Sequence, residues 1–229
     1  MIPTVTRRVL AEFVGTGFLV AAVIGSGIAA VRLSPHDVGL QLLENSIITG
    51  AALVALILAL QPVSAAFNPV VTLVERALGA VSSRDAALLI AAQFAGGILG
   101  AIVANLMFAL PAVHLSTRHR GGAGVQLGEV VATVGLLVVV FGTVRAGRSD
   151  RVAFAVGGYI LAAYWFTSST SFANPAVTVA RMLSDTFAGI APSSTALFVG
   201  MQLLGGLLGY GLIRGLYPNP AAIAAEAVT

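Results

Sequence analysis

Long apolar segments alternate with short polar connectors along most of the chain. Six of these segments are each about 20 residues long, enough for an α-helix to cross a hydrocarbon core of about 30 Å. They cover residues 8–31, 40–60, 85–109, 126–145, 151–168 and 194–216. This pattern predicts an all-α membrane protein with six transmembrane helices, the first of which is too long for a signal peptide.

Two further apolar stretches, residues 68–78 and 174–184, are too short to cross a membrane alone. Both begin with an Asn-Pro pair, a common helix start because Asn caps the first turn and Pro suits its first position. The motifs are Asn68-Pro69-Val70 and Asn174-Pro175-Ala176. A single motif of this kind would indicate only an ordinary helix, so its significance depends on the duplication.

The chain repeats itself at three places in the same order. "AEFVGTGFLV" resembles "GEVVATVGLL", "SAAFNPVVT" resembles "SFANPAVT", and "AAQFAGGILGAI" resembles "GMQLLGGLLGYG". Each half contains three spans, so the second half must enter the membrane from the opposite side. We expect one channel domain over residues 1–229, with halves at about 1–110 and 125–217 and a cytoplasmic tail at about 218–229.

An inverted repeat predicts two half-helices that enter from opposite faces and meet near the midplane. Their free N–H groups and positive dipole ends then face the same point. We expect a narrow polar track there that admits neutral hydrogen-bonding solutes and repels cations.

Glu12 and Glu129 lie at equivalent places inside apolar spans, where a carboxylate is expensive and usually functional. Each could accept hydrogen bonds from the re-entrant loop of its own half, or the two could form a proton relay for coupled transport. Their symmetric duplication favours the loop-supporting role. Nearby glycines, among them Gly96 and Gly100, have the spacing of close helix crossings.

Composition narrows the functions further. Hydrophobic residues make up 58% of the chain and charged residues 9%, and all twelve basic residues are arginines. In the predicted topology, eight of these lie on the same face of the membrane as the N-terminus or at its boundary, and four lie on the opposite face, which favours cytoplasmic termini. With no cysteine, no phosphate loop and no nucleophile motif, we expect no enzyme, no cofactor and no nucleic-acid partner. His114 and His119 lack nearby carboxylate ligands, so we expect no metal site.

These motifs together resemble the aquaporins, or major intrinsic proteins. The resemblance rests on the paired Asn-Pro motifs, on the Glu of "AEFVGT" and "GEVVAT", and on the third and sixth spans, and it covers essentially the whole chain. It implies a right-handed bundle of six transmembrane helices with two re-entrant half-helices. It also implies a homotetramer in the lipid bilayer, with one pore per subunit for water or small uncharged solutes.

Departures from the family pattern concern the pore. Ala66 stands where a histidine is usual, and Val70 replaces the alanine of the first motif. The arginine that usually follows the second motif and projects into the selectivity filter is replaced by Val177. The other filter positions align with Thr49, Ala162 and Ser171. The resemblance therefore implies a wide filter that is small, uncharged and free of arginine.

Arg181 offers an alternative, because it lies one helical turn beyond Val177 and could replace the missing arginine. We expect instead that it contributes to the outer vestibule or forms a salt bridge with Asp185.

An arginine-free filter resembles the aquaglyceroporin-like channels of bacterial arsenic-resistance operons. Thr178 also departs from the aspartate of glycerol facilitators. The resemblance implies arsenite, methylated arsenicals, glycerol and water as solutes, in a bacterial inner membrane. The alternatives are a general glycerol, urea and water facilitator, a proton-coupled transporter, a hydrolase and a closed junction protein.

Overall fold

The computed structural model describes residues 3–217, and this part of the chain contains eight α-helices and one 3-10 turn. In chain order they are α1 (Val5–Leu33), α2 (Val38–Leu60), α3 (Pro69–Ala77), α4 (Ser83–Met107), α5 (Ala123–Arg145), η1 (Ser149–Arg151), α6 (Val152–Phe166), α7 (Pro175–Arg181) and α8 (Pro192–Leu216). The tail expected at residues 218–229 lies outside the described residues.

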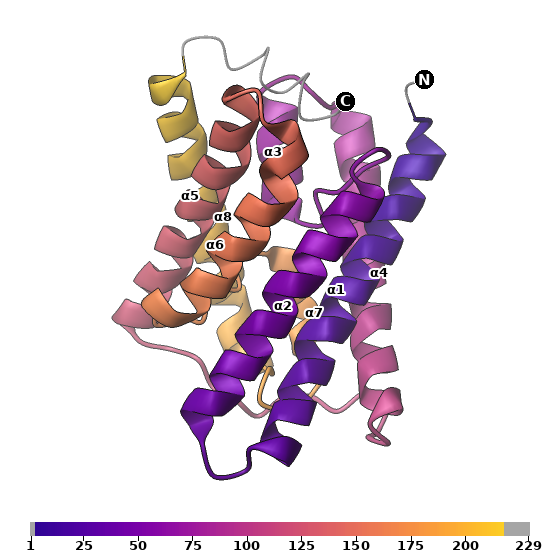
Figure 1. Ribbon diagram of the computed structural model, residues 1–229, viewed down its shortest axis with the longest axis vertical. Helices are drawn as coiled ribbons and strands as arrows, with labels where there is room; N and C mark the ends of the chain where they lie inside the picture. Colours follow the sequence, from indigo (N-terminus) through magenta and orange to yellow (C-terminus); the bar gives the residue numbers. More distant parts are fainter. Residues whose placement is uncertain (1–2, 218–229) are drawn as a thin grey trace.

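Six long helices surround the two short ones, α3 and α7, and the start of α1 and the end of α8 lie at the same end of the bundle (Figure 1). Five of the long helices are apolar and long enough to cross a membrane. The fifth predicted span is shorter than expected, because α6 has 15 residues and η1 supplies its first turn. The predicted all-α membrane fold with two half-helices is confirmed.

Polar side chains in the connectors determine where three of the long helices begin. The hydroxyl of Thr4 accepts a hydrogen bond from the first turn of α1, Asp37 accepts the N–H of Leu40, and Ser82 accepts the N–H of Asp85. Each cap satisfies a backbone donor that the helix itself leaves unpaired. The polar connectors therefore end one span and start the next.

Glycines allow α1 and α4 to touch backbone to backbone. A Cβ atom added at Gly96 would collide with the carbonyl group of Phe13, and one added at Gly100 would collide with that of Gly17. Small residues at such crossings let membrane helices approach closely and gain dispersion contacts. The close crossing predicted from glycine spacing is present.

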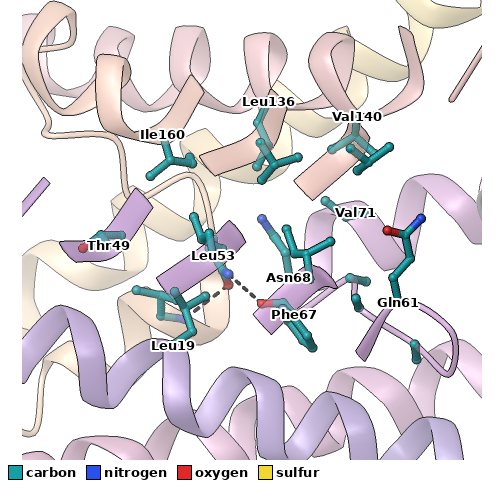
Figure 2. A pocket seen from close by; sticks show the side chains of 18 of the residues that line it. Leu19, Thr49, Leu53, Gln61, Phe67, Asn68, Val71, Leu136, Val140 and Ile160 are labelled. Atoms are coloured by element: carbon teal, nitrogen blue, oxygen red, sulfur yellow. Dashed lines mark hydrogen bonds between the residues drawn. The ribbon is translucent and has the colours of Figure 1, made fainter. Parts of the chain in front are cut away.

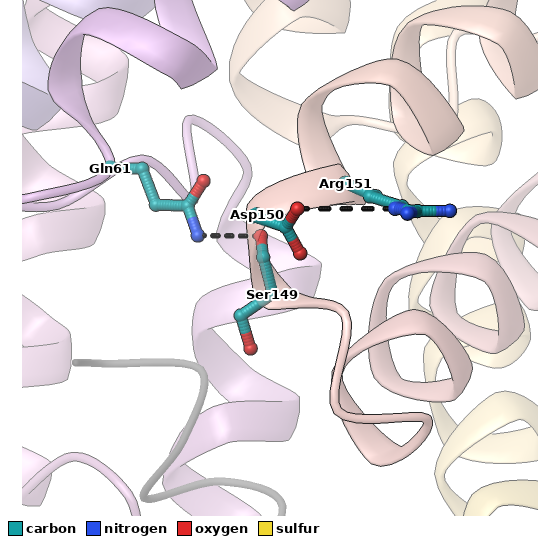
Figure 3. Close-up of polar contacts among 4 residues, drawn as sticks. All are labelled: Gln61, Ser149, Asp150 and Arg151. Atoms are coloured by element: carbon teal, nitrogen blue, oxygen red, sulfur yellow. Dashed lines mark hydrogen bonds and ion pairs between the residues drawn. The ribbon is translucent and has the colours of Figure 1, made fainter.

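A side-chain amide joins the end of α2 to the start of α6. Gln61 donates from Nε2 to the backbone oxygen of Ser149 over 2.9 Å, as Figure 3 shows. The neighbouring ion pair between Arg151 and Asp150 spans 3.9 Å, with side chains 66% and 79% exposed. That pair joins two adjacent residues of η1 and is exposed, so it adds little stability, and the Gln61 bond makes the link to α2.

We predict that Gly100→Ala lowers the midpoint of thermal unfolding in detergent, because the added methyl group must push α1 away from α4. Overpacking of this kind typically costs about 1–3 kcal/mol. Gly211→Ala is the matched control, since a Cβ at Gly211 meets no atom within 4 Å among the described residues. Equal midpoints for the two variants would contradict the proposed tight crossing.

Candidate functional site

The two half-helices meet through their asparagines, and each asparagine bonds to the loop of the other half. Asn68 donates from Nδ2 to the carbonyl of Ala173 over 2.8 Å, and Asn174 donates to the carbonyl of Phe67 over 2.7 Å. The Oδ1 atom of each asparagine caps its own helix. That of Asn68 accepts the N–H of Val70 at 2.9 Å, and that of Asn174 accepts the N–H groups of Ala176 and Val177. The two tips therefore hold each other in place.

The loops that lead into the tips have a strained backbone. Phe67 and Ala173, the residues just before the two asparagines, have φ angles of 47° and 48°, and Thr170 and Ser171 are also left-handed. Residues other than glycine adopt this region rarely. Something outside the loops must stabilise it.

The buried carboxylates provide that stabilisation. Glu12 accepts the N–H of Ala66 at 2.9 Å and that of Phe67 at 2.7 Å. Glu129 accepts the N–H of Phe172 at 2.9 Å and that of Ala173 at 3.0 Å. A carboxylate that receives several backbone donors is a strong anchor for a loop.

A glutamine completes each anchor in the same way. Gln93 donates to Glu12 over 2.8 Å and to Thr72 over 3.0 Å. Gln202 donates to Glu129 over 2.6 Å and to Thr178 over 2.8 Å. Both glutamates are fully buried behind the loops, and neither lines the cavity described next. These contacts favour the loop-supporting role over the proton relay.

A continuous cavity passes the two tips, and both Asn68 and Asn174 line it. Along α1 its lining extends from Arg8 to Val23, a rise of about 22 Å at 1.5 Å per residue. We call its two ends the Arg8 end and the Arg181 end.

The walls of this cavity differ in polarity. Leu136, Val140 and Ile160 form an apolar wall, and the Asn68 amide points into the space before it (Figure 2). The asparagines and the loops that precede them supply the polar side. Such a lumen suits a solute that has hydroxyl groups on one side and carbon on the other.

Three of the four predicted filter residues line the cavity together: Thr49, Ser171 and Val177. Ala162 does not, because its side of α6 is exposed on the outside of the bundle. Tyr164 lines the cavity instead, with its hydroxyl 3.2 Å from that of Thr49. Residues two positions apart on a helix point in directions that differ by about 200°, so Ala162 points away from the cavity that Tyr164 lines.

The helix period places Tyr164 on the same face as the other lining residues of α6, but it does not by itself select which face turns inward. The residues of α6 that line the cavity are Val152, Val156, Ile160 and Tyr164, which are four apart and therefore share one face.

Arg181 also lines the cavity, one helical turn beyond Val177, as a vestibule residue would. Its side chain is 2% exposed, and its guanidinium lies over the Phe172 ring at 3.4 Å while Nε donates to the carbonyl of Ala188. The expected salt bridge with Asp185 is absent within residues 3–217. Asp185 instead accepts hydrogen bonds from the N–H and hydroxyl of Thr117.

A second guanidinium, missed in the sequence, lies on the same ring. Arg120, from the connector between α4 and α5, stands 4.9 Å from the Phe172 centroid and donates to the carbonyl of Gly189 over 2.9 Å. Burial, and then the charge of Arg181, lower the pKa of Arg120 to about 9. The Arg181 end of the cavity is therefore positively charged, and no local motif around Arg120 indicates this role.

A helical membrane bundle whose two half-helix tips meet beside a continuous lumen defines a transmembrane channel. The chain belongs to the Major intrinsic protein family, whose sequence pattern matches residues 2–164. It is accordingly a channel and not an enzyme.

Similar proteins support this assignment. The chain is 48% identical to the aquaglyceroporin AqpS of Rhizobium meliloti, covering 92% of this chain and 90% of that protein. It is 29% identical to the aquaporin AqpM of Methanothermobacter thermautotrophicus, covering 81% and 87%. The X-ray structure of the aquaglyceroporin from Plasmodium falciparum matches with a TM-score of 0.70 over 93% of this chain and 96% of that chain. At 18% identity, that likeness shows the shared fold alone.

We predict that Glu129→Gln lowers thermal stability and the yield of folded protein. An amide has one acceptor oxygen, so its NH₂ group would face either the N–H of Phe172, at the position of Oε1, or the donors of Ala173 and Gln202, at the position of Oε2. Hydrogen bonds to charged groups contribute about 1.5–3 kcal/mol each. The measurement is the unfolding midpoint, with Asp150→Asn as an exposed control. A stable Glu129→Gln protein that had lost only a pH-driven component of uptake would support a relay instead.

Proposed function

We propose that this protein is a passive aquaglyceroporin-type channel for glycerol, water and other small uncharged solutes, including arsenite and methylated arsenicals. The observation that carries the proposal is the two-sided lumen, with the Asn68 and Asn174 amides opposite the apolar wall of Leu136, Val140 and Ile160. A polyol presents both kinds of surface, with hydroxyl groups for the amides and carbon atoms for the apolar wall.

The filter residues support solutes larger than water. Thr49 and Val177 are small, and they share the lining with the larger Tyr164 and Arg181. Val177 adds no donor beside the second tip, so the hydrogen-bonding groups of this filter are the hydroxyls and the Arg181 guanidinium. Hydroxylated solutes can bond to them while their carbon atoms contact Val177.

Arsenite fits the same description, because at neutral pH it is the uncharged triol As(OH)₃. A methylated arsenical presents a methyl group that packs better against Val177 than against a guanidinium at that position. The 48% identity to a protein named aquaglyceroporin supports the polyol part of the proposal.

Cellular placement follows from the same proposal. We place the channel in the bacterial inner membrane as a homotetramer, with the Arg8 end and both termini on the cytoplasmic side. The arginine distribution supports this orientation. Large exposed apolar side chains, such as Leu10, Phe18, Leu127 and Leu207, suit contact with lipid or with neighbouring subunits.

The test is a panel of fluxes in proteoliposomes, with water, glycerol, urea, arsenite and methylarsenicals as solutes. We expect Val177→Arg to reduce methylarsenical flux at least fivefold and water flux much less, because the new side chain narrows the lumen beside Arg181. Val177→Thr, similar in volume and uncharged, is the control. Unchanged methylarsenical flux in Val177→Arg would reject the arsenical part, and a wild-type channel that passes only water would reject the polyol part.

Arg181 should control the exclusion of cations. We expect Arg181→Gln to increase sodium leak severalfold, because the guanidinium is the lumen charge nearest the filter while the helix tips remain. Arg84→Gln, at an exposed site on α4, is the control. Sodium leak equal to that of the wild type would show that the half-helix tips suffice.

A further inference from the structure

The lumen contains more positive than negative charge. Arg8 and Arg181 line it near its two ends, and the N-termini of α3 and α7 face it between them. Each helix N-terminus carries the equivalent of about half a positive charge. This arrangement repels cations, but by itself it attracts anions, so the exclusion of anions needs a separate source.

Glu75 is the one carboxylate among the described residues that line the cavity. It lies on α3, one turn beyond Val71, which also faces the lumen. Its side chain is 8% exposed, and within residues 3–217 its carboxyl oxygens have no hydrogen-bond or ion-pair partner. Glu12 and Glu129 cannot replace it, because both are fully buried behind the loops they hold.

An unpaired carboxylate on an apolar helix is costly unless water or a solute satisfies it. Because Glu75 lines the cavity, water or a solute in the lumen can satisfy its carboxyl group. The charged groups that act on it from the packed elements are Arg8 and Glu12, both on α1. Arg8 forms no ion pair with Glu75. Its Nε atom is buried and has no hydrogen-bond partner in the described part of the chain.

We propose that Glu75 is the anion barrier of the channel. In its ionised form the Glu75 side chain offsets the positive field of the half-helix tips and of Arg8, and it repels an anion that has entered the lumen. It also accepts hydrogen bonds from water and from neutral hydroxylated solutes, so their passage continues. The channel then rejects cations near Arg181 and anions near Glu75. This inference rests on the proposed channel function but not on its choice of solute.

The test is chloride permeability in proteoliposomes at pH 9, where the Glu75 carboxyl group is ionised, with osmotic water flux as the measure of an open, folded pore. We expect Glu75→Gln to increase chloride permeability at least tenfold and to keep water flux within about twofold of the wild type. Asp85→Asn is the matched control, a carboxylate-to-amide change on α4 away from the lumen. Glu75→Asp retains the charge and should retain chloride exclusion.

Wild-type chloride permeability in Glu75→Gln, together with normal water flux, would overturn the proposal. Should Glu75→Gln not fold, Glu75→Ala tests the same point without an amide in the lumen, with the same expectation for chloride. Glycerol flux is recorded separately. A channel that excludes glycerol yet gains chloride permeability in Glu75→Gln would refute the polyol proposal and support the anion barrier.

Discussion

The structure depends on the satisfaction of backbone N–H groups in two stretches of chain that are neither helix nor strand. In a membrane such backbone has no bulk water to bond to, so it needs partners within the protein. Glu12 and Glu129 provide them from the neighbouring helices, and Gln93 and Gln202 hold the carboxylates in turn. These four side chains, together with the asparagine bonds to the carbonyls of Phe67 and Ala173, keep both residues in a left-handed conformation.

The pore is a consequence of those anchors. Once the loops are held, each asparagine tip reaches the loop of the opposite half, and the lumen runs past both tips. The rigid tips supply a positive field that is the same for every solute. Discrimination is left to the side chains around them, which is where this chain departs from its relatives' usual pattern. Selection by charge and selection by size therefore depend on different residues. The guanidinium and carboxyl groups select by the charge of the solute, and Thr49, Tyr164 and Val177 set the width of the lumen.

Periodicity and repetition in the sequence predicted the helices, the half-helices and the paired roles of Glu12 and Glu129, because these follow from helix geometry and from symmetry. Prediction failed where a side chain's direction mattered. Ala162 was placed by alignment, whereas the face of α6 that lines the cavity carries Tyr164. Of the two roles expected for Arg181, the salt bridge with Asp185 is absent among the described residues, because Thr117 on a distant connector satisfies that carboxylate. Arg120 could not be found at all, since only the folded connector brings it to Phe172.

The exchange of hydrogen bonds between the two tips has a consequence for how the protein is made. Asn68 needs the carbonyl of Ala173, and Asn174 needs that of Phe67, so each half of the lumen wall is completed by the other. During synthesis the first half enters the membrane more than a hundred residues before its partner exists. Over that interval the amide of Asn68 lacks the Ala173 carbonyl that accepts its hydrogen bond in the folded chain, so the wall of the lumen is complete only when the second loop arrives.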